Sequence, residues 1–165
     1  MSPLFYYSYQ MISEVLIRNI IEKQALESDF FIVEVSVKPT NKIHVFIDSM
    51  QGITIGVCAK VSKHVEKTLL EKDQNFEIEV SSPGLDFPFR VQEQYDKNLS
   101  KKVTVIDTSG NKFVGILKKA TDSFIEIEIE EKVAIPGKKK KEIQVKTLKM
   151  FLQDIKTTKV FISFK

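Results

Sequence analysis

The sequence lacks the residues that metal centres and disulfide scaffolds need. Its 165 residues include one cysteine, Cys58, and two histidines. One cysteine cannot close an internal disulfide, and one cysteine with two histidines falls short of the four ligands of a structural zinc site. We therefore expect a protein of a reducing compartment with neither a metal nor another cofactor.

Export and membrane signals are also missing. The first cationic side chain is that of Arg18, so no charged region precedes an apolar segment, and no apolar run approaches the roughly 20 residues that span a bilayer. The sequence predicts a cytoplasmic protein that does not bind membranes. Residues 1–10 are aromatic without a pattern, and we interpret them as irregular chain or as a tag.

Catalytic motifs are absent as well. The chain contains no Gly-x-Ser-x-Gly elbow, no phosphate-binding Walker motif and no dinucleotide fingerprint. Cys58 and His64 fall on one expected helix, but six residues at about 100° each place them roughly 240° apart, too far for a nucleophile and its base. His44 alternates with apolar residues on an expected strand. We predict no enzyme and no small-molecule substrate.

Charge is distributed unevenly along the chain. Residues 1–90 contain 9 Lys and Arg against 12 Asp and Glu, a net charge of −3, whereas residues 91–165 contain 16 against 10, a net charge of +6. This asymmetry indicates that the second half contacts a polyanion and that the first half has another task.

The first half has the periodicity of a mixed α/β domain. Apolar residues three or four apart predict helices, and β-branched or alternating segments predict strands. In chain order we expect a helix at 13–27, strands at 30–38 and 42–48, a helix at 54–72 and a strand at 76–82. Helices packed on one face of this sheet would form a two-layer α/β sandwich over residues 1–83.

The second half is almost entirely β after a short helical stretch at 91–99. The expected strands are 102–107, 112–120, 124–130, 142–151 and 158–164. Five short strands in about seventy residues indicate a small closed or nearly closed barrel at 92–165, which would hide its edges. The fold class is α+β.

The segment 84–91 is expected to be a stiff linker between the domains. Pro83 and Pro88 fix φ and remove N–H donors, and Gly84 would allow torsions closed to other residues. The hydroxyls of Ser81 and Ser82 and the carboxylate of Asp86 can accept from neighbouring amides. Turn chemistry alone explains every one of these residues, so a purely structural role competes with a role in recognition.

This segment resembles the domain-junction signature of the bacterial ribosome maturation factor RimP family. The matching residues are Glu79, Val80, Ser81, Ser82, Pro83, Gly84, Leu85 and Asp86. Similar segments lie upstream and downstream, so the resemblance covers residues 12–165. They are Ile47-Asp48, Gly52 to Ile55, Cys58 and Phe113 to Leu117.

The resemblance implies an α/β domain followed by a barrel similar to Sm or SH3 folds. It also implies assistance in small-subunit maturation through contacts with rRNA and a ribosomal protein. Phe87 stands where the family usually has Arg, and Gly56-Val57 where it commonly has an acidic pair, so no role is carried over to those positions. We expect a monomer.

The strongest candidate for RNA contact is a run of four lysines after Pro136-Gly137, at the expected tip of a hairpin. Four ammonium groups can displace counterions from phosphates without reading bases. A solvated loop that only keeps a sheet edge soluble is the competing interpretation. The four lysines, with two that extend the patch, are Lys138, Lys139, Lys140, Lys141, Lys118 and Lys119.

A second basic stripe lies on the helix expected at 54–72. Lys60, Lys63 and Lys67 share its polar side, interrupted by Glu66, although amphipathic helices commonly carry lysine there. The strand at 124–130 presents alternate glutamates on one face. That face is interpreted as solvated and as repelling RNA. Its carboxylates are Glu126, Glu128 and Glu130.

Two alternatives remain open at this point. One is a stand-alone Sm-like RNA-binding protein that forms rings, which light scattering would separate from a monomer. The other is a thiol-dependent hydrolase built on Cys58 and the turn at Ser81-Ser82, which would require that Cys58→Ala abolish a measured turnover.

Overall fold

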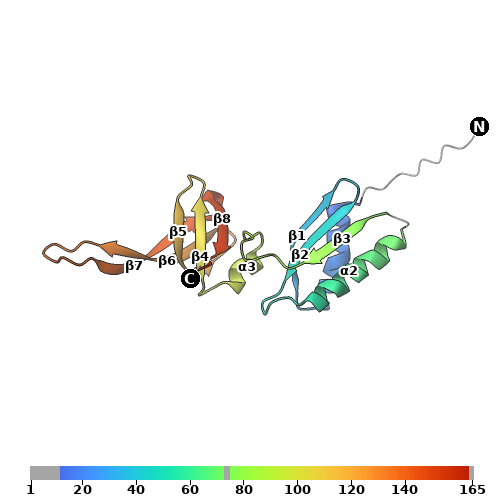
Figure 1. The fold of residues 1–165 in the computed structure, drawn as a ribbon, viewed down its shortest axis with the longest axis horizontal. Helices are drawn as coiled ribbons and strands as arrows, with labels where there is room; N and C mark the ends of the chain where they lie inside the picture. The colour runs from blue at the N-terminus through green and yellow to red at the C-terminus, as the bar shows by residue number, and fades with distance from the viewer. Residues whose placement is uncertain (1–11, 73–74, 164–165) are drawn as a thin grey trace, which may run out of the picture. The chain divides into compact units, whose positions relative to one another are not determined.

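The structure, a computed structural model, describes residues 12–72 and 75–163 and divides the chain into two compact units, 1–83 and 84–165. Each unit has its own buried apolar cluster. The opening segment at 1–10, interpreted above as irregular or as a tag, lies outside the described residues. Figure 1 shows both units and labels most of their helices and strands.

The first unit is the α/β sandwich that its periodicity predicts. Its elements are α1 (Glu14–Ala25), β1 (Phe31–Lys38), β2 (Lys42–Asp48), α2 (Ile55–Leu70) and β3 (Glu77–Ser81). β1 pairs antiparallel with β2, and β3 joins the other side of β2 in parallel. A parallel neighbour requires a crossover, which α2 supplies.

Side chains from both helices and from the sheet form a single core in this unit. Ile17 and Ile21 of α1, Val61 and Leu69 of α2 and Val45 of β2 are fully buried. Both helices begin at side-chain caps that satisfy free N–H groups. The Ser13 hydroxyl accepts from the Leu16 amide at 3.1 Å, and the Thr54 hydroxyl accepts from the Val57 amide at 3.2 Å.

The second unit is an antiparallel sheet with one short helix. Its elements are α3 (Gln92–Lys97), β4 (Lys102–Asp107), β5 (Lys112–Ala120), β6 (Phe124–Val133), β7 (Glu142–Phe151), a 3-10 turn η1 (Leu152–Asp154) and β8 (Ile155–Val160). Their order across the sheet is β7-β6-β5-β4-β8. Five residues are fully buried in its centre. They are Val103, Val105, Leu117, Ile125 and Ile127.

The sheet is open, which corrects the expectation of a closed barrel. Within the described residues β7 pairs only with β6 and β8 pairs only with β4, so the two outer strands do not join. The strand expected at 158–164 is also displaced, because β8 follows η1 directly and occupies Ile155–Val160.

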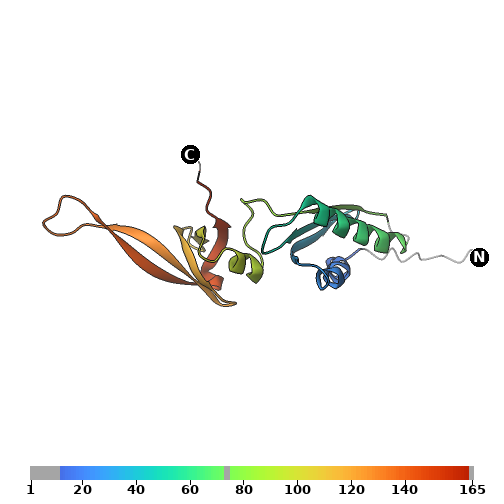
Figure 2. The same ribbon diagram turned by 90° about the horizontal axis from the view of Figure 1, so that it is seen from below.

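β6 leaves β5 halfway along its length. The β5–β6 ladder extends only to the pair of Ile116 with Glu128, whereas β6 stays paired with β7 from Phe124 as far as Val133. A Cβ at Gly115 would lie 2.5 Å from the Glu128 carbonyl oxygen, so only glycine permits the close approach of the two backbones there. Beyond this point β6 and β7 form a free two-stranded ribbon (Figures 1 and 2).

The segment after β3 is turned and anchored to the second unit. The Phe87 amide donates to the Gly84 carbonyl at 2.9 Å, and the Phe89 amide donates to the Thr158 carbonyl at 2.8 Å. Gly84 has no left-handed φ and a Cβ there would meet nothing within 4 Å, so the expectation that it needs glycine's torsions is wrong. The Asp86 carboxylate accepts from Lys159 at 3.4 Å.

Two neighbouring leucines on α2 test the packing of the first unit. Leu69 is fully buried and Leu70 is 66% exposed. We expect Leu69→Ala to lower the free energy of unfolding by about 2–5 kcal/mol. Leu70→Ala should change it by less than about 0.5 kcal/mol. Urea unfolding followed by circular dichroism measures both, and equal effects would contradict the assigned faces of α2.

Gly115 and Gly84 form a second matched pair. Gly115→Ala forces a methyl group against backbone atoms of β6, and we expect a loss of about 1–3 kcal/mol in the stability of the second unit. Gly84→Ala meets open space and should stay within about 0.5 kcal/mol of the parent protein. The same urea titration compares them, and an unaffected Gly115→Ala variant would argue against the close strand crossing.

Candidate RNA-binding surface

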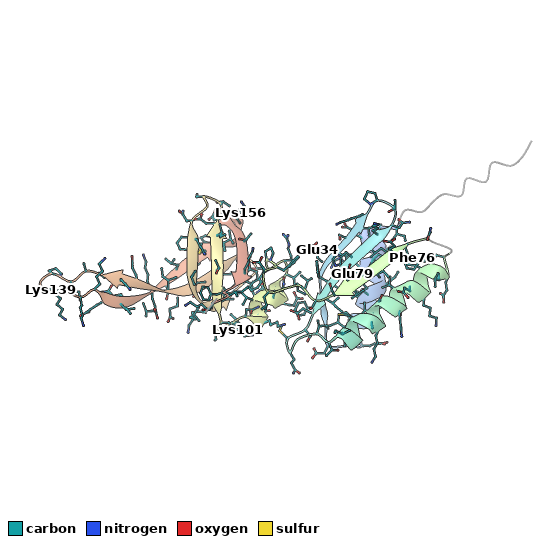
Figure 3. All side chains as sticks on the ribbon, in the orientation of Figure 1. Glu34, Phe76, Glu79, Lys101, Lys139 and Lys156 are labelled. Atoms are coloured by element: carbon teal, nitrogen blue, oxygen red, sulfur yellow. The ribbon has the colours of Figure 1, made fainter. Side chains whose placement is uncertain are left out.

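The lysine run lies at the end of the β6–β7 ribbon. Residues 134–141 form the connecting loop, named here the hairpin tip. Its turn is closed by the Lys138 amide, which donates to the Ile135 carbonyl at 3.1 Å, with φ of +86° at Gly137. Proline followed by a left-handed glycine is typical of a type II turn. Figure 3 shows Lys139 at the far end of the hairpin.

The positive charge of the hairpin is concentrated toward its tip. Residues 132–146 carry six lysines and one glutamate, whereas residues 124–131 carry four glutamates and no cation. Lys138 pairs with Glu142 at 2.9 Å, but both side chains are at least half exposed, so water screens this pair. Within the described residues the other three tip lysines have no carboxylate within salt-bridge distance.

Lys118 and Lys119 do not belong to this tip. Both lie on β5, where Lys119 pairs in register with Glu126 of β6. The tip begins eight residues further along β6, which at about 3.3 Å per residue is roughly 26 Å away. Lys118 contacts Glu128 at 3.8 Å. The sequence suggested that the six lysines form one patch. In the structure they form two separate clusters.

The lysines of α2 lie in the first unit. Lys60, Lys63 and Lys67 are exposed on the side of the helix opposite its buried residues. Glu66 is half-buried and accepts from the Ser62 hydroxyl at 3.3 Å, so it is turned along the helix. The three lysines therefore form an exposed stripe. The stripe and the hairpin belong to different compact units.

The glutamate row of β6 lies on the face opposite the core. Ile125 and Ile127 are fully buried, so the alternate residues Glu126, Glu128 and Glu130 point the other way. Glu130 is exposed, Glu126 and Glu128 are half-buried, and Glu128 pairs with Lys118 at 3.8 Å. The register places Lys119 and Lys149 beside Glu126, and Lys118 contacts Glu128, so cations of the neighbouring strands offset part of the charge of this row.

Sequence reasoning missed an aromatic cluster at the base of the hairpin. Phe124 pairs across the ladder with Phe151, and their ring centroids are 6.3 Å apart. The Lys149 ammonium lies 4.0 Å from the centre of the Phe124 ring, and that of Lys119 lies 5.4 Å from it. Only the β6–β7 register brings these residues together, because 26 residues separate the two phenylalanines in the chain.

The cysteine lies in the core and not at an accessible site. Cys58 is buried in the core of the first unit, and burial raises the pKa of its thiol. Across the described residues no group of three or more His, Cys, Asp or Glu side chains is placed to hold a metal ion. None of the helices in that part of the chain has the length and apolar character to cross a bilayer.

Comparison with known proteins identifies the family. A family model described as the RimP N-terminal domain matches residues 16–86. A protein named ribosome maturation factor RimP from Porphyromonas gingivalis is 32% identical over 146 residues, which cover 88% of this chain and 96% of the relative. The chain belongs to the RimP family of ribosome maturation factors.

Other RimP proteins match over a similar extent. The protein of that name from Christiangramia forsetii is 27% identical and covers 90% of this chain and 97% of its own length. The one from Cytophaga hutchinsonii is 26% identical and covers 84% and 89% respectively. The suspected RimP resemblance is confirmed, and a family of maturation factors agrees with the prediction that the chain is not an enzyme.

The reactivity of Cys58 provides a test of its buried position. The thiolate is the reactive form, so a raised pKa and a buried sulfur both slow reaction with a disulfide reagent. At pH 8 we expect labelling at least about tenfold slower in the native protein than in urea. Raising the pH through the ordinary thiol range should weaken the folded state slightly, since the unfolded thiol ionises first. Equal labelling rates would place Cys58 at the surface.

Proposed function

We propose that this chain assists maturation of the small ribosomal subunit by holding rRNA phosphates with the hairpin tip. The observation that carries the proposal is the position of Lys139, Lys140 and Lys141 at the end of a free ribbon without carboxylates within salt-bridge distance among the described residues. Such ammonium groups neutralise phosphates, release counterions and give binding without base specificity. Lys138 joins them once its exposed pair with Glu142 opens.

The ribbon places these lysines far from the rest of the sheet. It extends five residue pairs beyond the last contact with β5, roughly 17 Å at about 3.3 Å per residue. Ile143 and Val145 on the ribbon are each 61% exposed. A two-stranded ribbon cannot cover such side chains by itself, which favours a partner surface that covers them.

The first unit is proposed to contact a ribosomal protein. Residues 1–83 contain 8 Lys and Arg against 11 Asp and Glu, a net charge of −3, which suits a basic protein better than RNA. Lys60, Lys63 and Lys67 are proposed as a second, weaker RNA contact, because their stripe is exposed and regular. The turn that contains Leu85 and Asp86 is proposed to connect the two domains, with 84–91 as the linker.

Further expectations belong to the same proposal. The sheet order, in which four consecutive strands form a meander and the fifth returns beside the first through a 3-10 turn, supports an Sm- or SH3-type arrangement in an open form. We propose that the protein acts as a cytoplasmic monomer without a cofactor, a membrane contact or a small-molecule substrate.

Substitution of the tip lysines tests the main proposal. We expect Lys139, Lys140 and Lys141 changed together to serine to weaken binding to precursor small subunits. The slope of log affinity against log salt concentration should fall by about 2 to 3, since each phosphate contact contributes roughly 0.7–0.9. Sedimentation with precursor and with mature small subunits across a salt titration measures both effects.

The matched control removes the same charge from the other unit. Lys60, Lys63 and Lys67 changed together to serine should alter the slope less, because α2 is proposed as the weaker contact. Equal slopes for the tip variant and the parent protein would remove the tip from the mechanism. Association of the parent protein with neither kind of subunit would remove the whole proposal.

A further inference from the structure

The base of the β6–β7 hairpin presents an aromatic surface that phosphate binding at the tip does not use. Phe124, Phe151, Lys119 and Lys149 form what is named here the base cluster. Their shared face follows from the register, which pairs Phe124 with Phe151 and places Lys119 and Lys149 on either side of Glu126. Ile125 is fully buried on the opposite face, so the cluster faces away from the core.

One ring of this cluster is exposed and the other is half-buried. Phe151 remains 46% exposed, and neither Phe151 nor Phe124 is among the side chains that pack against the buried cluster of the same unit. The two rings meet edge to face, at 70° between planes and 6.3 Å between centroids. This geometry leaves ring faces for other partners, since an edge-to-face pair covers one face at most.

Ammonium groups flank these rings. Lys149 lies 4.0 Å from the centre of Phe124 and 5.5 Å from that of Phe151, and Lys119 lies 5.4 Å from Phe124. Two cations accompany one carboxylate in this row, that of Glu126. Aromatic faces combined with cations that reach a phosphate are what proteins use to bind unpaired nucleotides, with the base on the ring and the backbone on the lysines.

We propose that the base cluster is a stacking platform for an unpaired nucleobase of single-stranded RNA. The base stacks on Phe151, supported by Phe124, while Lys149 and Lys119 move from the rings to the adjacent phosphates. Stacking of a base outweighs an exposed cation–π contact, so this exchange is favourable. The proposal rests on the proposed function in one respect, namely that the second unit binds RNA.

The absence of tryptophan from the chain permits a direct test. In Phe151→Trp the single indole replaces the exposed ring and reports stacking through its fluorescence. The probe is a single-stranded oligoadenylate of twelve nucleotides, compared with an abasic strand of the same backbone. We expect oligoadenylate to quench Phe151→Trp and to bind it as tightly as the parent protein, whereas the abasic strand produces little quenching.

Removal of the ring should weaken binding while leaving the fold intact. Phe151→Leu keeps an apolar side chain at a half-exposed position, and we expect its affinity for oligoadenylate to fall by about 5- to 50-fold. Leu99→Ala is the matched control, because Leu99 is a 40% exposed apolar residue of the same unit outside the hairpin. It should bind as the parent protein does. Circular dichroism and urea midpoints confirm that each variant folds.

Three results would overturn the platform. They are parental affinity in Phe151→Leu, equal affinity of the parent protein for the abasic strand, and no measurable binding of oligoadenylate. If any of these occurs while the tip variant still loses affinity for precursor subunits, the proposed function stands and the platform falls. If oligoadenylate binds with quenching but no subunit does, the platform stands and the proposed function falls.

Discussion

The approach of β5 to β6 at Gly115 is the constraint on which the functional surface depends. A side chain at this position would collide with the Glu128 carbonyl, so glycine alone lets the strands cross closely. Beyond the crossing β6 loses β5 as a partner and keeps only β7. The free ribbon starts there. Its length sets the distance between the lysines at its end and the five-stranded part of the sheet.

Charge along this hairpin is ordered so that its two ends can act separately. Glu126 and Glu128 lie where β6 is paired with β5, beside lysines of the neighbouring strands, and Glu130 and Glu131 follow on the free ribbon. The four tip lysines lie beyond these carboxylates, whereas Lys119 and Lys149 lie beside phenylalanine rings at the base. The tip is proposed to hold the phosphates of a nucleic acid, and the base cluster is proposed to hold an unpaired base.

The glycine of the family signature does not have the special backbone conformation that the sequence suggested. Gly84 needs no special torsion, so among these residues only Pro83 and Pro88 restrict the backbone by their own covalent structure. Two hydrogen bonds also hold the segment. The Phe87 amide donates to the Gly84 carbonyl and closes the turn, and the Phe89 amide donates to the Thr158 carbonyl of β8. The signature spans the division between the units, since Glu79 to Pro83 end the first and Gly84 to Asp86 begin the second.

The sequence by itself determined the element types, because periodicity reports directly which side of a helix or strand is buried. The α1 and α2 spans, the β1–β2 hairpin and the alternation of β6 all follow from local pattern. Motif residues also sufficed for the RimP family, since they are contiguous in the chain.

Only the tertiary structure decided what depends on register and on long-range approach. The open sheet, the release of β6 at Gly115 and the meeting of Phe124 with Phe151 arise from pairings between distant residues, which no local periodicity encodes. For the same reason the sequence placed Lys118 and Lys119 with the tip. The distance from Lys118 and Lys119 to the tip is set by the number of β6 residues between them, which only the strand register reveals.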